Sequence, residues 1–189
     1  MTEAEILALF RRSGALLEGH FRLSSGLHSP GYLQSALVLQ HSRDAEALAT
    51  ALAEQVRGWG AGCVLSPALG GIVIGQELGR ALEVRAIFAE RQDGALTLRR
   101  GFRLEPGEKV LVVEDVLTTG GSSRETMQVA ERAGATVVGA CAIVDRSGGH
   151  PELHVPFRAL LSMRLPTYPP ESCPLCSQGL PVVKPGSRG

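Results

Sequence analysis

The chain has 189 residues, of which 44% are hydrophobic and 20% are charged, a composition typical of one ordinary globular domain. Its 19 basic and 19 acidic residues cancel, so it lacks the excess of positive charge found in proteins that bind nucleic acid or membrane surfaces. The first ten residues include Glu3 and Glu5 and contain no basic region, unlike a signal peptide. We therefore expect a cytoplasmic protein of one domain, residues 1–189, with neither a nucleic-acid nor a membrane partner.

The first forty residues are predicted to hold one helix and an extended, turn-rich segment. Residues 2–13 are expected to be helical, because Thr2 and Glu5 form a capping box and apolar residues recur at helical spacing. Residues 19–34 follow and contain the Gly, Ser and Pro clusters that are typical of turns. Turns are expected at residues 24–26 and 29–31. We expect residues 1–40 to form an N-terminal helix and a hood segment, and this segment and the C-terminal strap together to make a small hood beside the main domain.

From residue 41 onward, short apolar strands alternate with amphipathic helices. Strands are predicted at residues 63–66, 84–89, 109–114, 136–144 and 158–163. Helices are predicted at residues 45–57, 72–82 and 122–133, the last beginning with a capping box of Ser122 and Glu125. This alternation indicates an α/β fold, in which a parallel sheet is flanked by helices on both faces.

The C-terminal segment has a different composition from the rest of the chain. Six prolines fall within little more than twenty residues after Leu165. Proline at this density is incompatible with a long helix or a central strand. We expect residues 165–189 to form an extended strap over the domain, whose α/β core occupies residues 41–164.

The segment from Val110 to Ser122 is the most informative about chemistry. Its aliphatic strand ends in two adjacent carboxylates, Glu114 and Asp115, at the edge of a parallel sheet where α/β proteins bind ligands. The loop of residues 118–122 then reads Thr-Thr-Gly-Gly-Ser and leads into a predicted helix. Glycine backbone N–H groups, hydroxyl donors and a helix N-terminus suit a phosphate monoester. The carboxylates suit ribose hydroxyls or a divalent cation.

Other phosphate-binding loops fit the sequence less well. The Gly-x-x-x-x-Gly-Lys-Ser/Thr pattern of P-loop ATPases is missing, and no lysine precedes Lys109. The Gly-x-Gly-x-x-Gly pattern of dinucleotide-binding proteins is missing after the first strand of the core as well. A plain binding module with an incidental strand-to-helix turn is the simpler alternative, but it leaves the paired carboxylates and threonines unexplained.

Residues 110–122 resemble the phosphoribosyl-pyrophosphate signature of the type I phosphoribosyltransferases. Residues 66–71, Ser-Pro-Ala-Leu-Gly-Gly, resemble the pyrophosphate-binding loop of that family. Residues 21–30, the pair Asp145-Arg146 and the Cys-Pro-Leu-Cys sequence of the tail are similar to orotate phosphoribosyltransferases in particular. The resemblance implies an enzyme that transfers the 5-phosphoribosyl group from 5-phosphoribosyl 1-pyrophosphate (PRPP) to orotate, giving orotidine 5′-monophosphate and pyrophosphate in pyrimidine biosynthesis.

The resemblance also implies roles for individual residues. PRPP would be bound by Glu114, Asp115, Val116, Leu117, Thr118, Thr119, Gly120, Gly121, Ser122, Ala68, Leu69, Gly70, Gly71 and Arg91. Orotate would be bound by Thr118, Arg146, Tyr32 and Leu33. The catalytic residues would be Arg91, Asp115, Arg99 and Arg100. The family further implies a strained, non-proline cis peptide bond near Ala68-Leu69, Mg²⁺ held mainly by substrate oxygens, and a homodimer in which a mobile loop of one subunit reaches the other's site.

The sequence departs from the family's pattern at two places. The stretch that corresponds to the mobile loop, residues 90–102, contains neither lysine nor histidine. Arg91, helped by Arg99 or Arg100, is therefore expected to supply positive charge to the pyrophosphate, although arginine cannot donate a proton. Ser24 stands where many relatives have a lysine, and His28 is its expected substitute.

Cys173 and Cys176 have the spacing of a metal-binding or redox pair. The other two cysteines, Cys63 and Cys141, lie on predicted core strands and are not expected to complete a four-cysteine zinc site. We expect reduced, structural thiols at positions 173 and 176, with a zinc site shared across a dimer as the alternative.

The sequence leaves two other functions open. One is a phosphoribosyltransferase for uracil or a purine, which only an assay with each nucleobase would separate from the orotate enzyme. The other is a non-catalytic regulator that binds PRPP as an effector. Such a regulator needs a surface for DNA or RNA, for which this chain has neither an excess of basic residues nor spare length.

Overall fold

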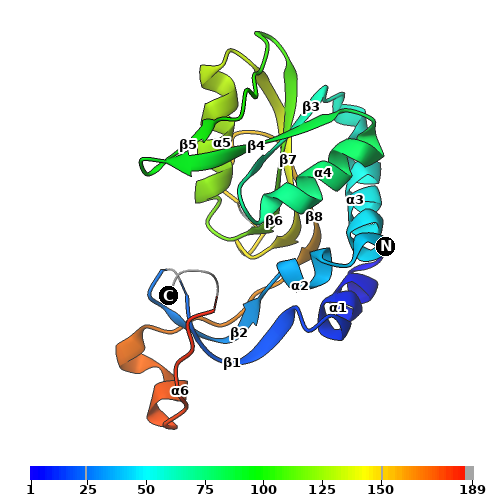
Figure 1. Cartoon of the computed structure of the whole chain (residues 1–189). Helices are drawn as coiled ribbons and strands as arrows, with labels where there is room; N and C mark the ends of the chain where they lie inside the picture. The colour runs from blue at the N-terminus through cyan, green and yellow to red at the C-terminus, as the bar shows by residue number, and fades with distance from the viewer. Residues whose placement is uncertain (24, 150, 186–189) are drawn as a thin grey trace.

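A six-stranded sheet forms the centre of the molecule (Figure 1). The structure is a computed structural model that describes residues 1–23, 25–149 and 151–185. In the order β5-β4-β3-β6-β7-β8, the strands are β5 (Ala95–Leu98), β4 (Arg85–Gln92), β3 (Cys63–Pro67), β6 (Lys109–Leu117), β7 (Thr136–Asp145) and β8 (Phe157–Ser162). All neighbours pair in parallel except β4 and β5. The predicted α/β architecture is confirmed.

Helices cover both faces of this sheet. The helices α3 (Ser42–Val56), followed by a single 3-10 turn η1 (Arg57–Trp59), and α4 (Gly71–Leu82) lie on one face, and α5 (Gly121–Arg132) lies on the other (Figure 1). Successive strand residues alternate between the two layers, so Val64 packs with α3 and α4 whereas Cys63 and Leu65 pack with α5. Burial on both sides explains why these strands read as continuous apolar runs.

The N-terminal helix α1 (Glu3–Arg12) belongs to the main body of the molecule. It begins after Thr2, which forms the predicted capping box: the Thr2 N–H donates to Glu5 Oε2 over 2.7 Å, and the Glu5 N–H donates to Thr2 Oγ1 over 3.3 Å. Its buried side chains Ile6 and Phe10 join the core beneath α3. Within residues 1–40, the helix therefore packs with the core, and only part of the remaining segment stands apart from it.

The part that stands apart is an antiparallel hairpin of β1 (Leu16–Arg22) and β2 (His28–Leu33), here called the hood hairpin. The short helix α2 (Ala36–Leu39) connects it to α3. The hood hairpin lies below the large sheet in Figure 1. The turn predicted at residues 29–31 was wrong, because this Ser-Pro-Gly sequence forms part of strand β2. Proline lacks a backbone N–H group, and it is tolerated here because β2 belongs to a sheet of only two strands.

The proline-rich strap follows the hood hairpin along much of its length. Arg22 N–H donates to the carbonyl of Val183 over 2.9 Å, and Tyr168 and His28 exchange two backbone hydrogen bonds of 2.8 Å. Two short helices interrupt the strap, η2 (Pro170–Ser172) and α6 (Pro174–Ser177), each with proline in its first turn. Long helices are excluded as predicted, but a wholly extended strap was wrong, since proline suits the first turn of a helix.

Two further predictions in the core were wrong. Strand β5 was missed, since its four residues, Ala95–Leu98, are too short to show alternation in the sequence. The capping box of Ser122 and Glu125 does not form, because α5 begins one residue earlier with Gly120 as its N-cap. The Glu125 carboxylate instead accepts hydrogen bonds from Arg91 and from the Leu96 N–H group of β5.

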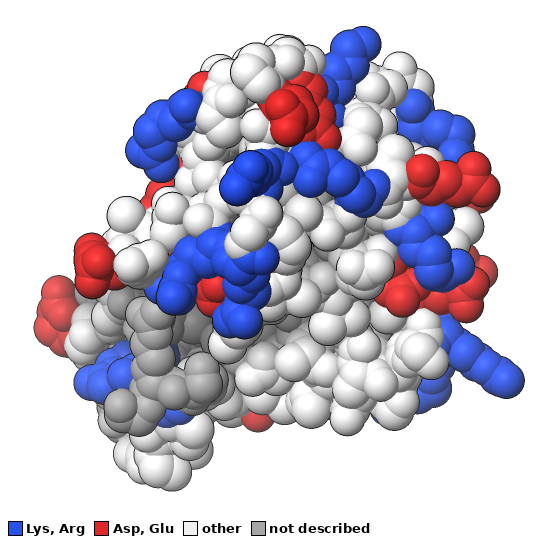
Figure 2. All heavy atoms as spheres, turned by 45° about the horizontal axis from the view of Figure 1, so that its top comes forward, with Lys and Arg blue, Asp and Glu red and all other residues white. Residues whose placement is uncertain are grey.

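The surface shows no segregation of charge on the face seen in Figure 2, where basic and acidic side chains are interspersed. Over the described part of the chain, no helix is both long enough and apolar enough to cross a bilayer.

Candidate functional site

Three loops meet where the parallel strands of the sheet end. Residues 68–70 follow β3, residues 118–120 follow β6, and Arg146 follows β7. Parallel strands end at one edge of a sheet, which is where such folds bind ligands. The first of these loops approaches strand β6 closely: a β-carbon at Gly70 would lie 2.8 Å from Asp115 Oδ2. The peptide bond between Ala68 and Leu69 in the first loop is cis, as the resemblance implied.

A cavity of about 1220 Å³ opens at this edge, large enough for a nucleotide-sized ligand. Residues of the hood hairpin, the sheet edge and the strap line it together. It brings together seven of the residues singled out in the sequence: Asp115, Val116, Thr118, Thr119, Arg146, Tyr32 and Leu33. All four residues predicted for orotate thus line this cavity, as do four of those predicted for PRPP, Asp115, Val116, Thr118 and Thr119. The other residues predicted for PRPP are not part of its lining: Glu114, Leu117, Arg91 and residues 68–71 and 120–122.

The two neighbouring carboxylates have different environments. Asp115 lines the cavity, where its Oδ2 accepts a hydrogen bond from the hydroxyl of Ser35. Glu114 points to the other side of β6, where it is only 9% exposed and accepts a hydrogen bond from the hydroxyl of Ser123 on α5. Burial raises the pKa of Glu114 to about 7, the bond from Ser123 opposes this shift, and the nearby Asp115 charge adds to it. The predicted contact with ribose fits Asp115, whereas for Glu114 it stays a prediction.

The loop after β6 has the geometry expected of an anion site. Gly120 has φ +73°, a left-handed conformation that glycine adopts without a steric penalty, and α5 begins at the next residue. The first N–H groups of a helix have no partner within it, so those of α5 are available beside the hydroxyls of Thr118 and Thr119. Both threonines are exposed, as are Gly121 and Ser122. A phosphate group could therefore be bound here by uncharged donors and the helix dipole.

Arg146 is the clearest indication of the kind of ligand that the cavity binds. Its Nε atom is buried and has no hydrogen-bond partner among the described residues, and the same holds for the hydroxyl of Ser147 beside it. Burial lowers the pKa of the Arg146 guanidinium, and the nearby Tyr32 opposes that shift. Burial also raises the pKa of Tyr32, as does Asp115. A buried N–H group of a guanidinium is costly unless it is paired, so this half-buried side chain calls for an anionic ligand.

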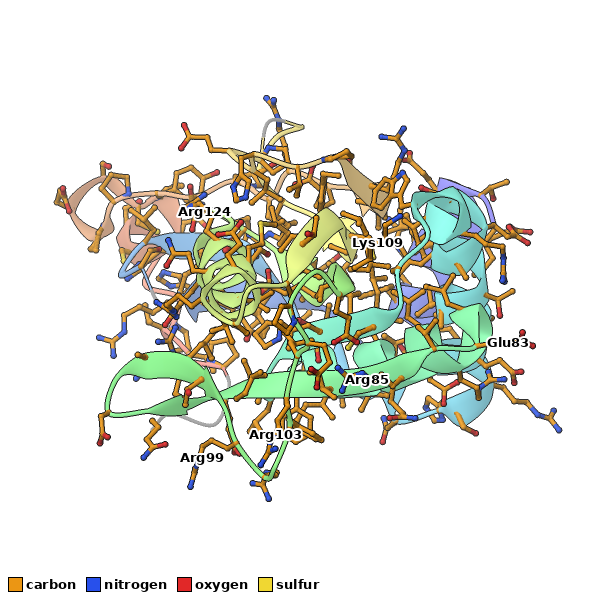
Figure 3. The ribbon with its side chains drawn as sticks, turned by 90° about the horizontal axis from the view of Figure 1, so that it is seen from above. Glu83, Arg85, Arg99, Arg103, Lys109 and Arg124 are labelled. Carbon is orange, nitrogen blue, oxygen red and sulfur yellow. The ribbon has the colours of Figure 1, made fainter. Side chains whose placement is uncertain are left out.

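The cations predicted for the pyrophosphate lie elsewhere in this structure. Arg91 donates to both oxygens of Glu125 over 3.1 and 2.7 Å and to the carbonyl of Gly94 over 2.6 Å. Arg100 forms an ion pair with Glu90 at 2.9 Å. Figure 3 shows Arg99 projecting outward beyond β5, on the opposite side of the view from Arg124. None of the three predicted arginines lines the cavity, so their catalytic role stays a prediction.

The stretch expected to be a mobile loop is largely a regular hairpin. Strands β4 and β5 pair from Ala89 with Leu98 to Gln92 with Ala95, and Asp93 and Gly94 form the turn between them. Glu125 of α5 fastens this hairpin through Arg91 and the Leu96 N–H group. Any movement of Arg91 toward a ligand must break these bonds.

Several residues of the cavity were missed in the sequence. Arg124 of α5 lines it and donates to the carbonyls of Thr119 and Glu152 over 2.9 and 3.3 Å. Arg22 and Lys184 reach it from the hood hairpin and the strap. The first turn of a helix beside a phosphate loop was a signal that could have identified Arg124. The other two depend on long-range contacts that no local pattern indicates.

The expectation that His28 compensates for the lysine that many relatives have at position 24 was wrong. Ser24 lies outside the described residues. His28 is buried, and its Nδ1 atom lies 2.9 Å from His20 Nε2 on the neighbouring strand. This side chain therefore faces the strap and does not line the cavity.

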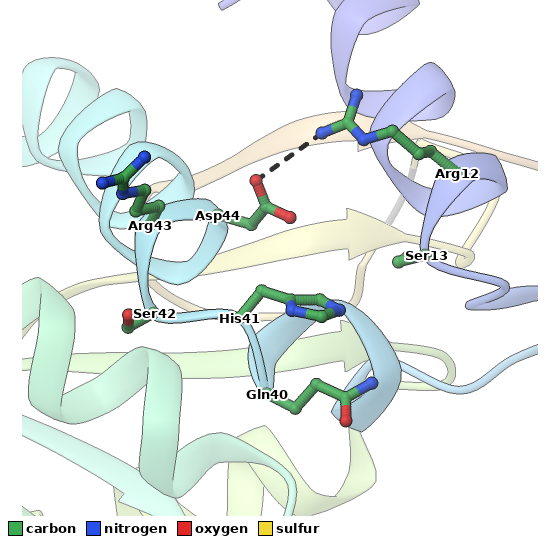
Figure 4. Close-up of a pocket in the computed structure, with 7 residues that line it drawn as sticks. All are labelled: Arg12, Ser13, Gln40, His41, Ser42, Arg43 and Asp44. Atoms are coloured by element: carbon green, nitrogen blue, oxygen red, sulfur yellow. Dashed lines mark ion pairs between the residues drawn. The ribbon is translucent and has the colours of Figure 1, made fainter.

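A second hollow of about 650 Å³ lies between the end of α1 and the start of α3 (Figure 4). An ion pair of Arg12 and Asp44, 3.6 Å apart, spans it. It contains none of the predicted site residues. We therefore place the candidate site in the larger cavity.

Three comparisons with known proteins agree with this arrangement. Residues 38–160 match the family model of the phosphoribosyl transferase domain. The orotate phosphoribosyltransferase of Pelotomaculum thermopropionicum is 55% identical, over all of this chain and 99% of its own length. The crystal structure of orotate phosphoribosyltransferase from Aeropyrum pernix matches with a TM-score of 0.69 at 26% identity, over 84% of this chain and 93% of that one.

A third match concerns a longer protein. The structure of Leishmania donovani UMP synthase matches 86% of this chain with a TM-score of 0.75 at 21% identity, and the chain spans 37% of that protein. At this identity the match supports the fold alone. Together with the cavity at the carboxyl edge of the sheet, the family match and the full-length relatives show that this chain belongs to the orotate phosphoribosyltransferase family of type I phosphoribosyltransferases.

Proposed function

We propose that the chain transfers the 5-phosphoribosyl group from PRPP to orotate, giving orotidine 5′-monophosphate and pyrophosphate in pyrimidine biosynthesis. The observation that carries this proposal is the half-buried Arg146, whose buried Nε has no partner among the described residues, in the same cavity as Asp115 and the Thr118-Thr119 loop. Orotate has the carboxylate that a guanidinium fork can bind with two hydrogen bonds, and uracil and the purine bases lack it. Membership of the orotate phosphoribosyltransferase family supports the same substrate.

The proposed pose of PRPP follows from the donors and acceptors of the cavity. The 5-phosphate would lie at residues 118–122, where helix N–H groups and hydroxyls donate hydrogen bonds. Asp115 would accept from a ribose hydroxyl, since a carboxylate accepts and a hydroxyl donates. The pyrophosphate would lie near residues 68–71, beside Asp115. Tyr32 and Leu33 would pack on the pyrimidine ring that Arg146 orients.

The reaction then asks little covalent chemistry of the protein. The bond between ribose C1 and the pyrophosphate oxygen breaks, and its electron pair leaves with pyrophosphate. An orotate nitrogen forms the new bond to C1 from the opposite face, and the proton that this nitrogen loses passes to the departing pyrophosphate. The chain's part is to hold the two substrates in line and to exclude water, which would otherwise hydrolyse the sugar donor. Arg91, with Arg99 or Arg100, would have to leave its present partners to stabilise the departing pyrophosphate.

The cavity fits the Mg²⁺ that the family resemblance implies. It offers the Asp115 carboxylate and the hydroxyls of Ser35 and Thr118, and oxygen atoms are the ligands that Mg²⁺ prefers. When bound, the ion would neutralise charge on the pyrophosphate oxygens. Few carboxylates face the cavity, which suits an ion held mainly by the substrate.

A homodimer and a cytoplasmic location are part of the same proposal. The family resemblance implies a dimer in which one subunit's loop completes the other's site. The arginines of the β4–β5 hairpin lie outside their own cavity, which is compatible with action on a neighbouring subunit. Sedimentation equilibrium with and without PRPP would test the assembly.

The function is tested by incubating the chain with PRPP and Mg²⁺ and with orotate, uracil, adenine or hypoxanthine in separate reactions. We expect pyrophosphate and the nucleotide product with orotate alone. Product with another base and none with orotate would contradict the proposed specificity. PRPP binding without turnover of any base would contradict the enzyme and favour a regulator.

A further inference from the structure

Four metal-binding side chains meet at the junction of the hood hairpin and the strap, away from the cavity. His20 lies on β1, His28 on β2, and Cys173 and Cys176 flank the start of α6. Their nearest ligand atoms all lie within 4.8 Å of one another. Residues from two ends of the chain, separated by about 150 positions, therefore converge on one point.

The spacing of these atoms is that of tetrahedral zinc ligands. Zinc bonds of about 2.0 Å to nitrogen and about 2.3 Å to sulfur, at tetrahedral angles, separate nitrogen from sulfur by about 3.5 Å and two nitrogens by about 3.3 Å. Cys173 Sγ lies 3.5 Å and Cys176 Sγ 3.7 Å from His20 Nε2. Cys176 Sγ lies 3.3 Å from His28 Nδ1, and the two histidine nitrogens are 2.9 Å apart. Small shifts would accommodate an ion.

The surroundings of His20 prepare it as a ligand. Its Nδ1 atom lies 2.8 Å from the carbonyl of Leu180, and a carbonyl can only accept, so Nδ1 carries the proton. The lone pair of Nε2 therefore points at the other three side chains. A backbone carbonyl that fixes the tautomer in this way is the usual outer partner of a metal-bound histidine.

Burial and redox state favour an ion over the alternatives. His20, His28 and Cys173 are 4%, 6% and 4% exposed, whereas Cys176 is exposed and leaves a path for an ion to enter. Both cysteines are free thiols. Two thiolates and two imidazoles at tetrahedral spacing select zinc over magnesium or calcium, which prefer oxygen.

We propose that His20, His28, Cys173 and Cys176 of one chain bind a structural zinc ion that joins the hood hairpin to the strap. Four protein ligands leave no open position, so the ion has no catalytic role of its own. It fixes two segments that both line the substrate cavity, the hairpin through Arg22 and Tyr32 and the strap through Lys184. The proposal differs from both expectations for the cysteines, since the ligand set would be completed within one chain by two histidines.

The experiment measures zinc in the full-length chain, purified under reductant and without chelator, by mass spectrometry of the elements. We expect about one zinc ion per chain, and its loss in Cys176→Ala. Cys63→Ala is the matched control, because it also removes one thiol but lies in the core of the sheet. Circular dichroism verifies that both variants are folded.

A second measurement needs no variant. The metal-free chain titrated with Co²⁺ should develop the visible absorption of a tetrahedral cobalt thiolate at one ion per chain, and added Zn²⁺ should abolish it. The proposal is overturned if the wild type, reconstituted with Zn²⁺, retains no more zinc than Cys176→Ala. It is also overturned if Cys63→Ala loses as much zinc, or if Cys173 and Cys176 are found joined as a disulfide. None of these readouts depends on phosphoribosyl transfer.

Discussion

Gly70 and Asp115, the latter on strand β6 and 45 positions further along the chain, lie so close together that a β-carbon on Gly70 would lie 2.8 and 2.9 Å from the two carboxylate oxygens. Asp115 is also held from the other side by the hydroxyl of Ser35. The carboxylate is therefore fixed between two segments. Any side chain at position 70 must displace it.

Gly70→Ala should lower kcat/KM for PRPP by about tenfold or more, because the added methyl group moves Asp115 away from the proposed ribose position. The backbone at Gly70 is ordinary right-handed helix, so the effect would not come from backbone strain. Gly58→Ala is the control, since a β-carbon there meets no atom within 4 Å. Equal activity of the two variants would show that the approach at Gly70 is unimportant.

Arg146→Ala should raise the KM for orotate by about ten- to a hundredfold, the value of a charge-assisted pair, and leave the KM for PRPP nearly unchanged. Arg146→Lys should recover only part of the loss, because an ammonium group cannot form the two parallel bonds of a guanidinium. Arg158→Ala is the control, because the side chain of Arg158 on β8 is exposed. If only the KM for PRPP rises, the Arg146 guanidinium binds PRPP and not orotate, which would contradict the proposed pose.

Arg91→Ala should lower kcat by more than about tenfold if Arg91 acts on pyrophosphate, as the family resemblance implies. The difficulty is that Arg91 is paired with Glu125, so a loss of activity could reflect a loosened hairpin. Glu125→Gln breaks that ion pair and keeps Arg91. Its kcat should remain close to that of the wild type, because a partly exposed pair contributes about 1 kcal/mol or less.

The pair of variants separates the two explanations. If Glu125→Gln loses as much activity as Arg91→Ala, then Arg91 acts only by fastening the β4–β5 hairpin to α5. An unchanged kcat in Arg91→Ala would refute any catalytic role for this side chain. Steady-state rates with saturating orotate and PRPP provide the measurement.

The stability of the unliganded protein should fall as pH rises from about 5 to about 8, in part because of Glu114. Its folded-state pKa is about 7 and its ordinary value is 4.5, so the folded chain holds a proton here that the unfolded chain releases. The stability this proton contributes is present below the ordinary pKa and is lost as pH rises through 7. The full shift corresponds to about 3 kcal/mol.

Glu114→Gln stays neutral at every pH. The difference between its free energy of unfolding and that of the wild type should therefore shift in favour of the variant as pH rises. Urea unfolding at several pH values provides the measurement. Glu54→Gln is the control, because Glu54 is an exposed residue of α3. Parallel pH dependences of wild type and Glu114→Gln would mean that Glu114 ionises normally in the folded chain.

The sequence determined the local features of this protein. The continuous apolar strands, the helices between them and the Thr2 capping box follow from the period and chemistry of neighbouring residues, and each was predicted within a few positions. The loop of residues 118–122 could also be assigned, because a phosphate site built from N–H groups, hydroxyls and a helix N-terminus lies within one continuous segment. Resemblance to a family then supplied Arg146, which proved to line the same cavity.

Only the tertiary structure decided which distant side chains meet. Glu114 and Asp115 are neighbours in the chain, but side chains alternate between the two faces of strand β6. Glu114 therefore contacts Ser123 of α5, and Asp115 lines the cavity. Arg91 forms an ion pair with Glu125 and does not line the substrate cavity, and His20 and His28 lie beside the two cysteines of the strap. These pairings depend on how the hairpins and the strap pack against their neighbours, and local sequence patterns carry no information about contacts between segments so far apart.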